Sequence, residues 1–88
     1  MITVTENAKK ELKEILVAAG AGPEEGLRLF PTETDNYLLG LDTEMSADQV
    51  VHYEGYKVLL VGIEYYRLLD GKIIDCLNTK EGFTLFVQ

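Results

Sequence analysis

The first apolar pattern along the chain has the spacing of an amphipathic helix. Its apolar residues recur every three or four positions, and they are Ala8, Leu12, Ile15, Leu16 and Ala19. This spacing puts them on one face of a helix, while the lysines and glutamates between them face water. Thr5 precedes the pattern and has the side chain of an N-cap, and Gly20, Gly22 and Pro23 follow it. We therefore predict one long helix near the N-terminus that packs by one face.

After this helix the apolar residues come in short runs that are typical of strands. Residues 26–42 contain two such runs on either side of the turn-rich segment 31–36, which predicts a hairpin. A short opening strand is expected at residues 2–4, and a short helix at residues 64–69. The remaining expected strands are residues 49–54 and 56–61, joined at Glu54-Gly55, and residues 72–77 and 83–87, joined by a five-residue loop at 78–82. The order predicts a single domain, residues 1–88, of the α+β class, mainly β with antiparallel strands.

The charge pattern limits the kinds of partner. The formal net charge is −7, and residues 24–54 account for all of it, since this segment contains eight acidic residues and one base, Arg28. Such a segment repels phosphate backbones, so we expect no nucleic-acid binding. It can attract a basic protein or a hard cation, or simply keep the protein in solution. The chain has no apolar run of the ~18 residues that cross a bilayer and no targeting pattern at its start, so we expect no membrane contact and a cytoplasmic protein.

Acidic side chains in the 31–36 loop are the candidate metal ligands. Glu33 and Asp35, together with Asp42 and Glu44, offer carboxylate oxygens of the kind that Ca²⁺ and Mg²⁺ prefer. Their spacing matches no calcium-loop motif, so we favour a solvated acidic hairpin tip over a metal site. No nucleophile triad, phosphate loop or zinc spacing is present, so we expect no enzyme.

Four other side chains are candidates for binding. Tyr53 and Tyr56, together with the acidic loop, suit a protein-binding face, although aromatic residues in strands are first of all packing groups. His52 has one carboxylate neighbour in sequence, which is too few ligands for a metal. Cys76 is the single cysteine and stands among apolar residues of an expected strand, where a free thiol usually packs as a small hydrophobic side chain.

Several stretches, taken in order, resemble the motifs of the HesB/IscA-like domains, the A-type iron–sulfur carriers. They are residues 2–8 (ITVTENA), 26–29 (GLRL), 39–42 (LGLD), 48–51 (DQVV), 55–61 (GYKVLLV), 69–75 (LDGKIID) and 82–85 (GFTL). The resemblance spans nearly the whole chain. It implies a HesB-like antiparallel β-sandwich with one N-terminal α-helix and a short second helical turn.

The family's chemistry implies a ligand set that this sequence does not match. In the family, one cysteine lies in a Gly-Gly-Cys-Ser-Gly-type loop after the Gly-Leu-Arg strand, and two lie in a C-terminal Cys-Gly-Cys. Soft thiolates of this kind hold iron–sulfur clusters and ferrous iron. Here residues 31–36 (PTETDN) contain no cysteine, the sequence stops at Gln88 before the second motif, and Cys76 is at none of the ligand positions.

We therefore expect a cysteine-poor, truncated HesB/IscA-like domain that holds no cluster or other cofactor by the usual ligands. Its expected function is accessory to iron–sulfur cluster biogenesis, through contact with a protein partner, and a homodimer is compatible with the sequence. The alternative is a small acidic binding module that takes a divalent cation or a basic protein at the 31–36 hairpin loop.

Overall fold

Helix α1 (Glu6–Ala18) begins where the sequence predicts it, in a computed structural model that describes residues 2–32 and 37–88. The hydroxyl of Thr5 accepts a hydrogen bond from the backbone N–H of Ala8 at 3.1 Å, as an N-cap does. Ala8, Leu12 and Leu16 are buried, which confirms the apolar stripe over these turns. Ala19 was expected on the same stripe but is exposed, because the helix has already ended and Ala19 is its C-cap.

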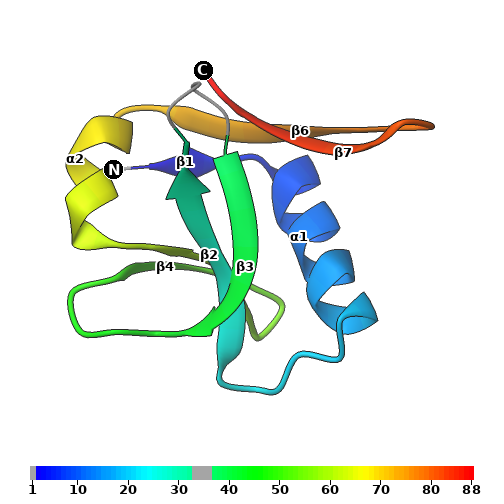
Figure 1. The fold of residues 1–88 in the computed structure, drawn as a ribbon, viewed down its shortest axis with the longest axis horizontal. Helices are drawn as coiled ribbons and strands as arrows, with labels where there is room; N and C mark the ends of the chain where they lie inside the picture. Colours follow the sequence, from blue (N-terminus) through cyan, green and yellow to red (C-terminus); the bar gives the residue numbers. More distant parts are fainter. Residues whose placement is uncertain (1, 33–36) are drawn as a thin grey trace.

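A four-stranded sheet carries the predicted hairpin (Figure 1). Strands β2 (Glu25–Pro31) and β3 (Tyr37–Thr43) pair antiparallel along their whole length. Strands β4 (Gln49–Tyr53) and β5 (Tyr56–Val61) also pair antiparallel, and the strand order is β3-β2-β5-β4. The turn expected at Glu54-Gly55 is present, with φ values of 49° and 85°, so β4 ends one residue earlier than the predicted strand 49–54.

The centre of this sheet is a parallel pair, β2 with β5, and Gly26 allows its close approach. A Cβ atom added at Gly26 would collide with the carbonyl oxygen of Lys57 on β5. A glycine is therefore needed on β2 for steric reasons, independent of any turn.

The second sheet has three strands in the order β1-β6-β7. Strand β1 (Thr3–Val4) runs parallel to β6 (Ile73–Thr79), and β7 (Gly82–Val87) runs antiparallel to β6. The prediction of a five-residue loop between the last two strands is wrong. Pairing continues to Thr79 and Gly82, so only two residues form the turn, and Gly82 adopts a φ of 122° that favours glycine.

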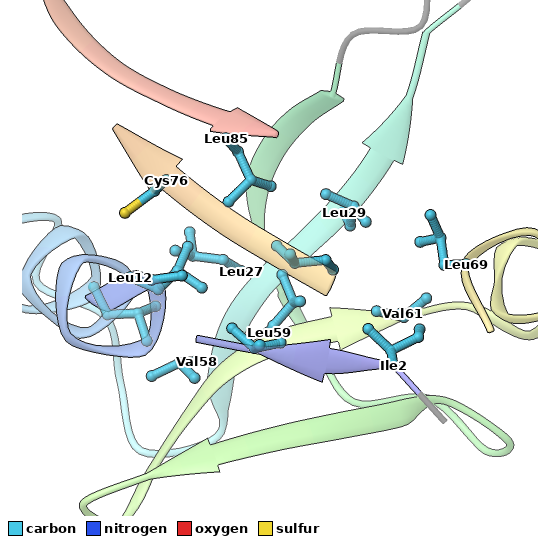
Figure 2. Close-up of a cluster of buried hydrophobic side chains, with 14 residues drawn as sticks. Ile2, Leu12, Leu27, Leu29, Val58, Leu59, Val61, Leu69, Cys76 and Leu85 are labelled. Carbon is cyan, nitrogen blue, oxygen red and sulfur yellow. The ribbon is translucent and has the colours of Figure 1, made fainter. Parts of the chain in front are cut away.

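Helix α2 (Ile63–Leu69) connects the two sheets and matches the predicted short helix. In the described residues, neither helix is long and apolar enough to cross a membrane. The core lies between the two sheets and the buried face of α1 (Figure 2). The fold class is confirmed as α+β and mainly β. Both sheets are mixed, since each contains one parallel pair formed by strands that are not consecutive in the chain.

Candidate functional site

Arg28 on β2 is the centre of a buried ionic cluster on the face of the four-stranded sheet that looks away from the core. Its Nε donates to Oδ2 of Asp42 on β3 at 2.6 Å, and its Nη1 and Nη2 donate to the two carboxylate oxygens of Asp48 at 3.0 and 2.6 Å. Nη2 also donates to the carbonyl oxygen of Thr43 at 3.1 Å. This two-pronged contact with Asp48 has the geometry in which arginine binds carboxylates most strongly.

The environment of this cluster keeps both acids ionised. The Arg28 guanidinium lowers the pKa of Asp48 and that of Asp42, and the backbone N–H groups of Met45 and Thr43 lower them further. The Asp48 side chain is 4% exposed and that of Arg28 is 9% exposed. A carboxylate whose oxygens already accept hydrogen bonds from a guanidinium and a backbone N–H has little capacity to bind a cation. Asp42, a member of the acidic metal set considered from the sequence, therefore already has a partner.

A second polar link joins the start of α1 to β6. The hydroxyl of Thr5 donates to Oδ1 of Asp75 at 2.7 Å while it caps the helix, and the backbone N–H of Cys76 donates to the same oxygen at 2.8 Å. These hydrogen bonds lower the pKa of Asp75. The contact fixes the helix N-terminus on the three-stranded sheet.

Cys76 lies in the core, on the side of β6 that faces α1 (Figure 2). It is 4% exposed, and its Sγ is 3.4 Å from Nδ2 of Asn7. Burial raises the pKa of the thiol, and the charges of Glu11 and Asp75 raise it further. This environment favours the neutral thiol over the thiolate that binds metal.

The start of β3 lies beside the C-terminal strand. Tyr37, the first residue of β3, shares with β7 a surface cavity of about 390 Å³. Its lining residues are Tyr37, Leu68, Leu69, Lys72, Thr84, Leu85, Phe86, Val87 and Gln88. A second cavity, of about 540 Å³, continues along β3 and β7. The side chains in both are mainly apolar, and within residues 2–32 and 37–88 no three His, Cys, Asp or Glu side chains gather as metal ligands.

The acidic residues of the 24–54 segment are largely paired in the fold. Besides the Arg28 cluster, Lys57 binds Glu24 at 3.2 Å and Glu44 at 3.4 Å, and Lys13 binds Glu54 at 2.9 Å. Glu25 accepts a hydrogen bond from the backbone N–H of Gly22. Lys13 and Lys57 come from outside the segment, so the excess charge counted along the sequence is partly neutralised in space. Glu33 and Asp35, the remaining acids of the segment, lie outside the described residues.

The two tyrosines that the sequence offered for protein binding lie opposite each other at the end of the β4–β5 hairpin. Tyr56 is 40% exposed, and the ammonium of Lys13 lies 5.3 Å from its ring centroid. Tyr53 is half-buried and lines a surface cavity of about 360 Å³ against α1. His52 is exposed on β4.

The sequence did not reveal Asp48 as a partner of Arg28; the one available signal was that Arg28 is the lone base of an acidic segment.

No protein-family model matches the chain, and no curated protein matches it. Solved structures do match. Escherichia coli SufA, described as involved in biosynthesis of iron–sulfur clusters, is 21% identical with a TM-score of 0.75, over 99% of this chain and 83% of that one. A protein from Aquifex aeolicus is 21% identical with a TM-score of 0.72, over 99% and 89%. IscA, crystallised with a [2Fe-2S] cluster, is 18% identical with a TM-score of 0.67, over 100% and 84%. This chain therefore has the fold of IscA and SufA.

Proposed function

We propose that this chain is a cytoplasmic accessory protein of iron–sulfur cluster biogenesis that has the IscA fold, does not itself hold a cluster, and acts through contact with other proteins. The observation that carries the proposal is the likeness to IscA and SufA over at least 99% of the chain, combined with a sequence that contains one cysteine. The protein is not an enzyme under this proposal, and its partners are proteins of cluster assembly.

The side chains present do not suit an iron–sulfur cluster. Clusters are held by several thiolates, with histidine as the usual substitute. Residues 31–36, where the resemblance puts the first ligand, contain neither cysteine nor histidine. The one thiol, Cys76, is buried against α1 with a raised pKa. Among the described residues that line the cavities shared by Tyr37 and β7, the polar side chains are Tyr37, Lys72, Thr84 and Gln88, and none of the lining residues is Cys, His, Asp or Glu.

The polar residues that this chain shares with the family motifs make contacts within the fold. Thr5 of the first motif donates to Asp75 of the sixth, and Arg28 of the second binds Asp48 of the fourth. Both contacts are satisfied within the chain and leave no group free for cluster chemistry. They support a scaffold retained without the ligand set, because fold and site chemistry can separate.

Anaerobic reconstitution with ferrous iron and sulfide tests the absence of a cluster. We expect iron and sulfide well below one per chain after desalting, with no visible charge-transfer absorption. The Cys76→Ser variant is the matched control and should give the same spectrum as the wild type. A stable, stoichiometric cluster that disappears in the Cys76→Ser variant would overturn the proposal.

Affinity capture with the full chain as bait tests the accessory role. We expect proteins of iron–sulfur assembly to be recovered and identified by mass spectrometry. A charge-matched bait with Tyr53→Ala and Tyr56→Ala probes the tyrosine pair named above. Recovery of only unrelated proteins by the wild-type bait would contradict an accessory role in cluster assembly.

A further inference from the structure

Two surface cavities adjoin along the open edge of β7. They have volumes of about 390 and 540 Å³, in the range of small-molecule sites, and both are lined by Tyr37, Thr84 and Leu85. Consecutive residues of β7, 84–87, line the smaller cavity, whereas one face of a strand would contribute only alternate residues. The two cavities therefore form one elongated cleft beside the edge of this strand, which we name the β7 cleft.

The two ends of the β7 cleft differ in polarity. The smaller cavity is bordered by Gln88 and by Lys72, which is exposed and forms no ion pair within residues 2–32 and 37–88. None of the described residues that line either cavity is Asp or Glu, although the chain has a net charge of −7. The cleft therefore has a positive end and an apolar end. Apart from the shared residues, the described lining of the larger cavity is entirely apolar and consists of Ile15, Leu27, Leu38, Leu39 and Phe83.

Backbone N–H groups add hydrogen-bond donors to the positive end. Ile73 and Gln88 exchange both backbone hydrogen bonds, at 3.1 and 2.8 Å. Because bonded pairs alternate along an antiparallel ladder, the N–H groups of Leu85 and Val87 point away from β6. Among the described strands only β6 pairs with β7, so these two N–H groups are available along the cleft. An anionic group beside Lys72 can thus accept hydrogen bonds from an ammonium and from a strand edge.

Hydrophobic side chains at the border of both cavities are left in water. Leu38 borders the larger cavity and Leu68 the smaller one, and they are 61% and 70% exposed. An alkyl chain in the cleft would remove part of this apolar surface from water, which is favourable. We infer that the β7 cleft binds a linear amphipathic monocarboxylate, with its carboxylate beside Lys72 and its alkyl chain along Leu85 and Phe83. The single ammonium matches a single negative charge, and the inference does not depend on the proposed role in cluster assembly.

Titration of the full chain with sodium decanoate, followed by ¹H–¹⁵N NMR, tests the positive end. We expect saturable shifts of the amide signals of Leu85 and Val87, and a dissociation constant about five- to tenfold weaker for Lys72→Met. Lys80→Met is the matched control, since Lys80 is an exposed lysine that lines neither cavity, and it should bind decanoate as the wild type does. The neutral probe 1-octanol should bind the wild type and Lys72→Met equally.

A series of chain lengths and one pair of leucine variants test the apolar end. From hexanoate to octanoate to decanoate, we expect the dissociation constant to fall about two- to fourfold per methylene group. Leu38→Ser should weaken decanoate binding about threefold, whereas Leu77→Ser, at a residue that is 57% exposed and lines neither cavity, should not. The absence of saturable shifts at millimolar decanoate overturns the inference and leaves the cleft to an apolar segment of another protein. Shifts confined to residues outside the cleft, or equal affinity of the wild type and Lys72→Met for decanoate, overturn it as well.

Discussion

Replacing Arg28 by methionine removes the positive charge that Asp42 and Asp48 share. Methionine keeps the length and apolar body of the side chain, so the change acts mainly on the ionic contact. Asp48 would remain 4% exposed with the backbone N–H of Met45, at 2.7 Å, as its remaining hydrogen bond. Removing one partner of a buried ion pair destabilises a protein by about 3–5 kcal/mol, because the other charge stays buried without compensation.

This loss is large for a chain of this size. At 0.05–0.15 kcal/mol per residue, 88 residues give a total stability of roughly 4–13 kcal/mol. We therefore expect Arg28→Met to lower the melting temperature by more than about 10 °C. Lys57→Met is the matched control. It breaks ion pairs with Glu24 and Glu44, whose side chains are 81% and 44% exposed, and should reduce stability by no more than about 1 kcal/mol.

Urea denaturation followed by circular dichroism measures the difference, and a double-mutant cycle isolates the pair. Asp48→Asn removes the charge but keeps the shape, so the combined variant Arg28→Met with Asp48→Asn should be no less stable than Arg28→Met alone. This non-additivity would give a coupling energy of about 1.5–3 kcal/mol. The reasoning fails if Arg28→Met is as mild as Lys57→Met, or if the two single effects simply add.

Four further outcomes follow from the same contacts. Arg28 lowers the pKa values of Asp42 and Asp48 in the folded state, so the stability that these carboxylates contribute is complete above the unfolded pKa of about 3.9 and is lost as pH falls through the folded values. In an acid titration, the Arg28→Met variant should therefore lose less folding stability than the wild type as the pH is lowered. Gly26→Ala should destabilise by about 1–3 kcal/mol in urea denaturation because its Cβ meets a backbone oxygen, whereas Gly40→Ala, which meets only the movable ring of Phe30, should be milder. Thr5→Ala should lower stability by about 1–2 kcal/mol, since it removes both the cap and the hydrogen bond to Asp75, and an effect below 0.3 kcal/mol would contradict that double role. Cys76 should react with a maleimide many-fold faster in urea than in native buffer, and equal rates would contradict its burial.

Local signals in the sequence were enough to predict the elements. The start of α1 follows from a hydroxyl at Thr5 before an apolar stripe, and the β2–β3 hairpin follows from two apolar runs around a turn-rich segment. Each of these depends on residues close together in the chain. The two-residue turn between β6 and β7 was missed because a five-residue polar stretch looks the same whether its outer residues pair or not.

Pairings between distant segments could not be predicted in the same way. β1 joins β6 over some seventy residues of chain, and β2 joins β5 in parallel, yet nothing in a strand's own pattern specifies its neighbour. The partners of the candidate metal ligands could not be predicted from the sequence for the same reason. Glu33 and Asp35 lie outside the described residues, and the partners of Asp42 and Glu44 were visible only once the strands were in place.

The acidic segment shows why a charge count along the chain is a weak guide to a binding surface. A run of eight acids with one base suggests a negative patch, but a patch requires that the side chains share a surface without counter-ions. Strand pairing instead brings Lys57 to Glu24 and Glu44, and helix packing brings Lys13 to Glu54. Arg28, the lone base in the count, binds two acids at once because β2 is flanked by β3 and faces the segment that precedes β4. Much of the charge of the described acids is therefore matched within the fold, and the most buried of these contacts, Arg28 with Asp42 and Asp48, joins β2 to β3 and to the segment before β4.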